Sequence, residues 1–552
     1  MLDAAKTPPS PPSATPAHGA PAHIRIPGRE KLVKFMGPSS KKRVIHYGED
    51  FLHVALPEGT RVIYPPQPLK PIPDVGAAVR HALNRPEGCD PLFAQLRPGM
   101  RVTIAIDDIS LPLPAMKSPD VRETALEAVL EQLAAYGVDD VEIIIALAIH
   151  RRMTAEEIRE VVGDRIFKAY YPKRLYNHDA EDPDAMTQLG ETEHGEKVIV
   201  NRRAAESDLL IYVNLNLVPM DGGNKSVGVG LTSYASLQAH HNPQTILDCW
   251  SYMDPEKSAM HRSCNRIGRV VNREMNVFHV ETTVNNNMFG GPLGFLHKDE
   301  DEWTTFDEWG FAALKATLSK LPRAAKRAFF HRYRAPYGVT GVHAGKTEPV
   351  HKKTLEASYR QYSVPVEGQT DVAIVGIPYL CPYNVNSIMN PVLVHCSALG
   401  YFFNMFRGKP VVREGGVLIV CHPLYDEFHP DHHPSYVEFF HRLLPETRDS
   451  KKLQHHHEEA FARDPAYVHM YRHGNAYHGA HPFYMWYWGE NGRKHVGRII
   501  SVAPESAYCA KTLGWDVAKD LDEALEMAET TVGRKPSVTM LHVPPILIAD
   551  VT

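Results

Sequence analysis

The chain has 552 residues, enough for two or three domains that each bury an apolar core. Its formal net charge is -5, and 23% of its residues are charged, so it lacks the basic field that nucleic-acid binding requires. The seven cysteines form no C-x-x-C pair, which favours a reducing compartment, and no apolar run approaches the length of a membrane span. We therefore expect a cytoplasmic, multi-domain enzyme without nucleic-acid or membrane partners.

The first segment, residues 1–27, is rich in proline, alanine and histidine and has few large apolar side chains. Such a composition cannot offset the entropy lost on ordering the chain. We predict a disordered N-terminal leader.

From residue 100 onward, apolar runs alternate with helical periodicity. Residues 101–108 predict a strand, 119–136 a helix, and 141–150 a buried parallel strand. Thr154 and Glu157 form a capping box that opens the next helix. This alternation indicates an α/β fold, with His150 at a carboxyl strand end, where ligand sites of such sheets lie.

Further strands are predicted along the rest of the chain, whereas residues 245–345 show weaker periodicity. These strands fall at 208–216, 372–377, 416–421, 498–503 and 537–543. We predict two α/β domains that face an interdomain cleft. The expected parts are an N-terminal domain at 28–290, a junction or insertion at 291–345, and a C-terminal domain at 346–552.

A glycine-rich loop with one lysine follows the predicted strand at 208–216. It reads VPMDGGNKSVGVG and contains Gly222, Gly223 and Lys225. Such loops bring backbone N–H groups close to a phosphate, and the lysine adds a charge or a nucleophilic amine. The loop matches neither the P-loop nor the dinucleotide fingerprint, and by itself a structural turn explains it better than a functional site does.

Five blocks in the same order give this loop a context. They are IDDISLPLP (106–114), ALAIHRRMTAEEI (146–158), residues 176–214, GGNKSVGVG (222–230) and LQAHHNP (237–243). Together they resemble the N-terminal domain of the lactate racemase family, and TDVAIVGIPY, VVREGGVLIV and residues 505–529 resemble its second domain. The resemblance implies a divergent, enlarged homologue that uses the family's nickel-pincer nucleotide.

The resemblance also implies how this cofactor is held. In the family, a pyridinium mononucleotide with one thioamide and one thiocarboxylate group is bound covalently to a lysine, here Lys225. Its ring carbon and two sulfurs bind nickel, and a histidine sixteen residues further on completes the site, here His241, with the adjacent His240 as the alternative. The remaining cofactor-contact positions are Asp108, Ser110, Gly222 and Gly223.

The family's reaction moves hydride from C2 of a 2-hydroxy acid to the cofactor while a histidine removes the hydroxyl proton, and His150 matches one of its two acid/base histidines. The second falls on Met220 and is missing. Asp221 is a candidate replacement base or, alternatively, a turn residue before two glycines. His178 either orders a loop or takes part in catalysis.

Other substrate-binding positions also differ from the family. Leu111 replaces the arginine that holds the substrate carboxylate, and the family's glutamine and lysine fall in an Asn- and Ser-rich loop (Asn384, Asn386, Ser387 and Asn390) that predicts a more polar substrate. The His-rich stretches at 421–441 and 455–457 lack zinc-ligand spacing and predict exposed polar loops.

These features predict a nickel-dependent racemase or epimerase of a 2-hydroxy acid other than lactate. The alternatives are hydride transfer without stereoinversion and a cofactor-binding homologue without catalysis. Its partners would be the small-molecule substrate and the proteins that make the cofactor.

Overall fold

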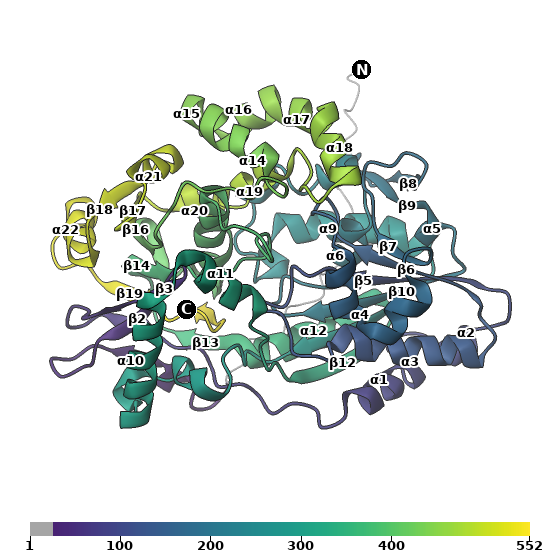
Figure 1. Cartoon of the computed structure of the whole chain (residues 1–552), viewed down its shortest axis with the longest axis horizontal. Coiled ribbons are helices and arrows are strands. Elements are labelled where there is room, and N and C mark those ends of the chain that lie inside the picture. The colour runs from purple at the N-terminus through teal and green to yellow at the C-terminus, as the bar shows by residue number, and fades with distance from the viewer. Residues whose placement is uncertain (1–25) are drawn as a thin grey trace, which may run out of the picture.

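The computed structural model describes residues 26–552, so the predicted leader at 1–27 lies outside the described residues except for its last two positions. Two mostly parallel sheets form the centre of the molecule, and helices surround them (Figure 1). This arrangement confirms the predicted α/β class.

One of these sheets has six strands and holds most of the N-terminal part of the chain. Its order is β12 (Val339–Gly345), β11 (Val277–Val284), β10 (Leu209–Asn216), β5 (Arg101–Asp107), β6 (Asp140–Ala146) and β7 (Leu175–Asn177). All neighbours are parallel except β12, which runs antiparallel to β11. Every residue of β10 is buried, as expected for a central parallel strand covered on both faces.

The other large sheet has seven strands. Its order is β1 (Val33–Phe35), β4 (Arg61–Ile63), β19 (Val538–Leu541), β14 (Thr370–Gly376), β16 (Val412–Cys421), β17 (Arg498–Val502) and β18 (Asp516–Ala518). The predicted strands at 372–377, 416–421, 498–503 and 537–543 are therefore present, and they pair in parallel.

Sheet membership differs from the linear domain boundaries expected at 28–290 and 346–552. β4 pairs with β19, because its three buried residues extend the apolar surface of the C-terminal sheet. In the opposite direction, β12 completes the N-terminal sheet, and α12 (Thr347–Tyr362) packs against β11. The chain therefore crosses between the two sheets more often than its apolar pattern shows.

Smaller sheets and hairpins complete the β structure. They are the three-stranded sheet β13 (Ser363–Val366), β20 (Ile548–Val551) and β15 (Phe406–Gly408), and the hairpins β2 (Arg43–Tyr47) with β3 (Asp50–Val54) and β8 (Met186–Glu191) with β9 (Lys197–Asn201). β2 and β3 pack against the inserted segment described next.

The helices expected near the N-terminal sheet are also found. The predicted helix at 119–136 is α3 (Val121–Ala135), which begins after the N-cap Asp120. The capping box of Thr154 and Glu157 opens α4 (Ala155–Tyr170), with both of its hydrogen bonds present. The local sequence signals therefore define both helix starts.

The segment 245–345 is more regular than its polarity suggests. It contains α9 (Ala259–Glu274), the buried strand β11, the 3-10 helix η3 (Gly291–His297), and the helices α10 (Thr305–Lys320) and α11 (Arg323–Arg332). Part of it forms a small separate core with the β2–β3 hairpin, in which Phe51, Phe295 and Phe311 are buried. This insertion is folded onto the body of the protein through its own apolar contacts.

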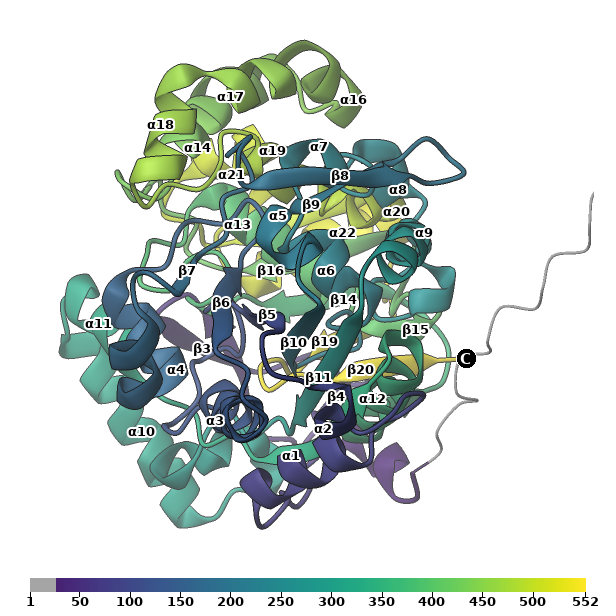
Figure 2. The same cartoon turned by 90° about the vertical axis from the view of Figure 1, so that its right-hand side faces the viewer.

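The His-rich segment after residue 421 is mainly helical, from α14 (Pro434–Glu438) to α19 (His481–Tyr487), and its helices lie at the top of Figures 1 and 2. His422 and His433 are buried, which corrects the exposed loop expected at 421–441, whereas His455 and His456 are exposed as expected but lie in a helix. The reason is aromatic packing: the ring of His433 stacks on Tyr477 at 5.2 Å. The Tyr234 hydroxyl, from α7 (Tyr234–Leu237), donates to Glu458 and so joins these helices to the N-terminal domain.

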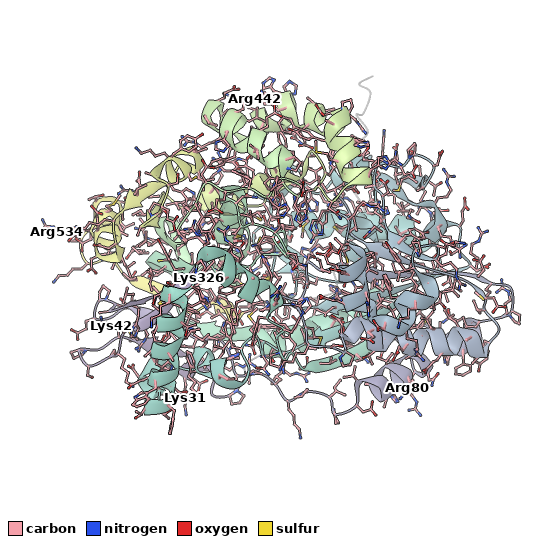
Figure 3. The ribbon with its side chains drawn as sticks, viewed as in Figure 1. Lys31, Lys42, Arg80, Lys326, Arg442 and Arg534 are labelled. Atoms are coloured by element: carbon pink, nitrogen blue, oxygen red, sulfur yellow. The ribbon has the colours of Figure 1, made fainter. Side chains whose placement is uncertain are left out.

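The outer surface carries charge in several places. Basic side chains labelled in Figure 3, such as Arg80, Arg442 and Arg534, lie far apart at the edges of the molecule. Among residues 26–552, no helix is both long and apolar enough to cross a bilayer.

Candidate active site

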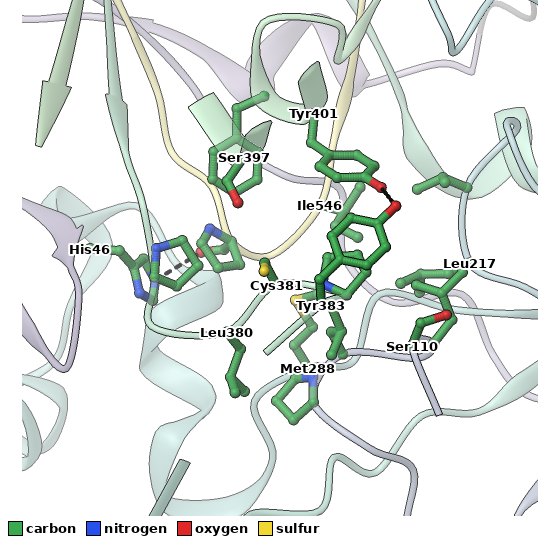
Figure 4. A pocket seen from close by; sticks show the side chains of 18 of the residues that line it. His46, Ser110, Leu217, Met288, Leu380, Cys381, Tyr383, Ser397, Tyr401 and Ile546 are labelled. Atoms are coloured by element: carbon green, nitrogen blue, oxygen red, sulfur yellow. Dashed lines mark hydrogen bonds between the residues drawn. The ribbon is translucent and has the colours of Figure 1, made fainter. Parts of the chain in front are cut away.

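One cavity of about 240 Å³ collects side chains from both halves of the chain (Figure 4). Of the predicted site residues, Ser110, His150, Asp221, Lys225 and His241 line it. We call Ser110, His150, Lys225 and His241 its cofactor end. Asp108, Gly222 and Gly223 lie directly behind this end, in contact with its members or in the same loop.

His150 lies in a loop after β6 and not on the strand itself. β6 ends at Ala146, because the N–H of Ala148 turns to donate to the Gly230 carbonyl and the N–H of His150 donates to Leu147. Ala148 has a φ of 51°, the left-handed conformation that this turn requires. The turn directs the imidazole into the cavity.

Asp108 fixes the orientation of this imidazole. Nδ1 of His150 lies 2.8 Å from Oδ2 of Asp108, while the other carboxylate oxygen accepts from the backbone N–H and the hydroxyl of Ser110. Burial opposes ionisation of Asp108, but His150 and Ser110 together hold its pKa below the usual value. The ionised carboxylate therefore accepts Nδ1–H and leaves Nε2 of His150 available to a substrate.

Arg122 supports the loop that carries Asp108. This arginine is buried, forms an ion pair of 2.9 Å with Asp120, and donates to the backbone carbonyls of Asp107 and Asp108. Helical periodicity predicts only that Arg122 lies on a helix, because a contact with a loop fourteen residues earlier has no local signal.

The glycine loop leads into α6 (Asn224–Gly230), which carries Lys225. Gly222 and Gly223 have φ values of 83° and 62°. A Cβ at Gly223 would lie 2.6 Å from Cδ2 of His351, and its N–H donates to Glu281 at 2.7 Å. Both glycines are thus required by left-handed backbone and close packing. The predicted contact of this loop with a phosphate stays a prediction.

Lys225 projects into the cavity from this helix. Its ammonium group donates to the carbonyl oxygen of Met220 at 3.3 Å. Lys225 is the only lysine or arginine among the described residues that line the cavity. The Asp221 carboxyl, which also lines the cavity, lies close enough to interact with the charge of Lys225. A lysine that reaches into a cavity in this way is a candidate nucleophile.

The hydrogen bonds of the two adjacent histidines distinguish their roles. Nε2 of His240 lies 3.2 Å from the carbonyl of Gly228, so this nitrogen carries the hydrogen. Burial lowers the pKa of His240 to about 4, so its Nδ1 has a free lone pair. That lone pair accepts from Nδ1 of His241 across 2.6 Å. Nε2 of His241 is therefore the unprotonated nitrogen.

His241 also meets the other requirements of a metal ligand. Burial, followed by the nearby His240 and Lys225, lowers the pKa of His241 well below its ordinary value, so the ring is neutral. Its imidazole stacks on Trp488 at 5.2 Å. His240 is fully buried with both nitrogens engaged, whereas His241 lines the cavity. The geometry favours His241 over His240 as the nitrogen donor.

The donor set fits the expected cofactor. One primary amine and one neutral imidazole with a fixed lone pair open onto the same cavity, and imidazole is a good ligand for nickel. Within residues 26–552, no group of three or more His, Cys, Asp and Glu side chains is placed to hold a metal ion. The expected site needs a single protein ligand, so these two findings are compatible.

The two remaining acid/base candidates differ in position. Oδ2 of Asp221 accepts from the N–H groups of Leu217 and Val218, both at 3.0 Å, which is the pattern of a turn former. Burial raises its pKa, and Asp221 still lines the cavity. His178 is buried away from the cavity, with Nε2 bonded to the Thr232 carbonyl, as expected for a residue that orders a loop.

The predicted polar cleft loop proved wrong. Asn384 bonds to the backbone of Cys381 and Tyr379, Asn390 caps α13 (Pro391–His395), and Asn386 donates to Glu157. None of the four Asn and Ser side chains of this loop is among the described residues that line the cavity. Asn384 and Asn390 stabilise the loop and the helix that follows it, and Asn386 joins the loop to α4.

Several cavity residues gave no signal in the sequence. Tyr383 and Tyr401 face each other, with their hydroxyl oxygens 2.7 Å apart, as Figure 4 shows. Burial raises the pKa of both phenols well above the ordinary value, so both stay neutral donors. They and Trp488 come from the C-terminal half, far from the motif blocks in sequence.

Comparisons with known proteins agree with this placement. Residues 47–250 match the lactate racemase N-terminal domain family. The chain is 28% identical over 173 residues to lactate racemase of Lactiplantibacillus plantarum and 24% identical to that of Thermoanaerobacterium thermosaccharolyticum. Each match covers 30% of this chain and 38% of the relative, so the chain spans well under half the length of these relatives.

The fold likeness is more extensive. The lactate racemase apoprotein structure from Thermoanaerobacterium thermosaccharolyticum aligns with 92% of this chain and 99% of its own, at a TM-score of 0.61 and 18% identity. Residues 47–250 therefore match the lactate racemase N-terminal domain family, and the fold of the whole chain is similar to that of a lactate racemase.

Proposed function

We propose that the protein is a nickel-pincer nucleotide-dependent racemase or epimerase of a 2-hydroxy acid other than lactate. The observation that carries the proposal is one cavity that joins the Lys225 amine, the free Nε2 of His241 and the Asp108-oriented His150. An amine for the tether, a donor for the metal and a base for the hydroxyl proton are what such a reaction needs.

Each residue has a separate task. Lys225 would carry the cofactor, and His241 would bind its nickel. When bound, the cofactor supplies an acceptor for the hydrogen and electron pair that leave C2 of the substrate. Nε2 of His150 takes the proton of the substrate hydroxyl, and Asp108 stabilises the imidazolium that results. On return, His150 gives the proton back to the oxygen.

A second function, hydride transfer without inversion, is favoured by Met220. This thioether lines the cavity at the position where the family has its second histidine. With one imidazole base, the proton can be returned from only one side of the substrate. The two functions differ in product: inversion gives both stereoisomers, whereas one-sided return exchanges the C2 hydrogen and retains configuration.

The decisive experiment produces the protein together with the cofactor-making enzymes. Peptide mass spectrometry should then find an added mass on Lys225, and elemental analysis should find one nickel per chain. Lys225→Ala should lose both signals, whereas Lys197→Ala, at an exposed lysine of β9, should keep them. A wild-type protein that carries neither mass nor nickel would refute the proposal.

Stereochemistry is tested with the loaded protein. A panel of 2-hydroxy acids deuterated at C2 is incubated with the protein in ordinary water. Chiral chromatography reports inversion, and mass spectrometry reports loss of the C2 deuterium. Inversion supports the racemase, and label exchange with retention supports the second function. Full loading without any reaction across the panel would instead indicate a homologue that binds the cofactor without catalysis.

A further inference from the structure

The cavity continues from the cofactor end into a region whose walls are almost wholly apolar. We call this region the apolar arm and define it by Phe289, Leu293, Leu314, Leu318, Phe329 and Phe330. These side chains come from η3, α10, α11 and the residue before Gly290. The arm is thus built by the insertion between the two domains.

We infer that the substrate of this site carries a large apolar substituent on C2 and that the apolar arm binds it. The inference rests on the proposed function and names its substrate class: 2-hydroxy acids with a long alkyl or an aryl group. Its basis is the match between a wall of aliphatic and aromatic side chains and a substituent that loses water on entering.

The missing arginine supports the same class. Leu111 lines the cavity at the position of the family's carboxylate-binding arginine, and Lys225 is the only basic residue among the described lining residues. Once Lys225 carries the cofactor, no lysine or arginine of the described lining remains to form a bidentate bond with the carboxylate. Affinity then has to come from another part of the substrate, and the apolar arm offers the area for it.

The polar groups of the cavity are placed consistently with this division. Ser110, His150 and His241 line the cavity at the cofactor end, and Figure 4 shows the hydroxyl groups of Tyr383 and Tyr401 facing each other. His46 and Tyr333 border the arm, where their rings pack on Phe289 and Phe329. Nε2 of His46 and the Tyr333 hydroxyl are already bonded to the backbone carbonyls of Pro544 and Met288. The arm itself has a floor of buried apolar residues, including Leu296 and Leu318, from the small core shared with the β2–β3 hairpin. A polyhydroxylated substituent placed there would lose its hydrogen bonds to water without replacement.

The test measures binding to the protein made without cofactor and, in parallel, to the loaded protein. Calorimetry compares lactate, 2-hydroxyhexanoate, 2-hydroxyoctanoate, 3-phenyllactate and gluconate. We expect affinity to rise about fourfold per added methylene, which corresponds to about 0.8 kcal/mol each, and gluconate to bind no better than lactate. Equal affinity across the series, or tighter binding of gluconate, would overturn the inference.

Matched leucine variants locate the effect. Leu314→Gln places an amide in the arm, and Leu321→Gln makes the same change at a leucine that is 37% exposed at the end of α10, outside the cavity lining. The first should weaken 2-hydroxyoctanoate binding roughly tenfold and lactate binding less than twofold, and the second should change neither. Equal effects of both variants would contradict a role of the arm.

Two further readouts keep the outcomes distinct. If circular dichroism shows that Leu314→Gln does not fold, Leu293→Gln on η3 repeats the test at a second leucine of the arm. Mass on Lys225 and bound nickel are measured on the same preparations. Chain-length dependence without nickel would support the arm and refute the proposed function, whereas nickel without chain-length dependence would do the reverse.

Discussion

The two ends of the cavity hold their side chains in different ways. At the cofactor end, His150 and His241 are each fixed by a hydrogen bond to a buried partner, Asp108 and His240. In the apolar arm, leucine and phenylalanine side chains are held by packing alone. Chemistry needs fixed donors and lone pairs, whereas accommodation of a substituent needs only volume and apolar area.

The same division follows the chain. The cofactor end lies within residues 47–250, which match the lactate racemase N-terminal domain, and the arm lies outside that range. An insertion can therefore change which substituent fits without moving the residues that we propose to act on C2. Single substitutions should therefore affect the two ends differently, whereas unfolding should affect both ends at once.

The largest effect is expected from acid, which should unfold both ends at once. Burial lowers the pKa values of His240 to about 4 and His261 to about 3 near the cofactor end, and of His46 to about 3 and His297 to about 4 near the arm. Because these values are depressed, the unfolded chain binds more protons below pH 6.5, and stability falls as the pH drops from about 6.5 toward 4.

At pH 5 each of these histidines should lower the free energy of unfolding by about 2 kcal/mol. The four together would remove a free energy comparable to the whole stability of an ordinary domain. Urea unfolding at pH 7.5 and pH 5, followed by hydrogen exchange of peptides from both ends, checks this. An equal free energy of unfolding at both pH values would contradict the destabilisation by buried histidines. Hydrogen exchange that increases at one end only would show that acid does not unfold the two ends together.

The next largest effect should be specific to the cofactor end. His150→Gln removes the proton acceptor for the substrate hydroxyl, so kcat should fall by about 10²- to 10⁴-fold for short and long substrates alike. Nickel content and the mass on Lys225 should stay at wild-type values. Steady-state kinetics on the loaded variant gives the answer, with the exposed His455→Gln as control. A loss confined to long substrates would place His150 in substituent binding instead.

A smaller effect is expected one residue away from the proposed metal ligand. Nδ1 of His240 accepts a hydrogen bond from Nδ1–H of His241 and so selects the tautomer of His241. His240→Phe removes this acceptor and should weaken nickel retention by roughly 10- to 100-fold. His240→Gln offers an amide oxygen as acceptor for Nδ1–H of His241 and should restore most of the loss. Nickel retained against a chelator is the readout, and equal losses in both variants would point to a packing role only.

How much of this could be predicted from the sequence differs between the two ends. The strands at 101–108 and 208–216 and the capping box at Thr154 follow local patterns, and the blocks around Lys225 and His241 carry the family resemblance. These are short-range signals, and the structure places the residues that they single out around one cavity. Their catalytic and ligand roles stay predictions.

The apolar arm could not be predicted in the same way. Leu314 and Phe330 are ordinary helix residues in a polar-looking segment, and only tertiary packing brings them to the cavity that also holds Lys225. The Asn-rich loop misled for the opposite reason: Asn384 and Asn390 look like substrate ligands, but their side chains satisfy the backbone of their own loop. Residue type gives the possible partners, and the fold decides between them.

The smallest effect is expected at Asp221, which lies in the cavity next to the cofactor end and tests how far that end extends. An asparagine can accept the N–H groups of Leu217 and Val218 through its amide oxygen, so Asp221→Asn should keep kcat within about threefold, whereas Asp221→Ala should destabilise the loop by about 1–3 kcal/mol through two unpaired buried donors. A fall in kcat of more than a hundredfold in Asp221→Asn, with nickel still bound, would make this carboxyl the second base in place of the histidine missing at Met220. Near-normal turnover would instead leave His150 as the one proton carrier of the cofactor end, and the stereochemical outcome would then depend on how the substituent is held in the apolar arm.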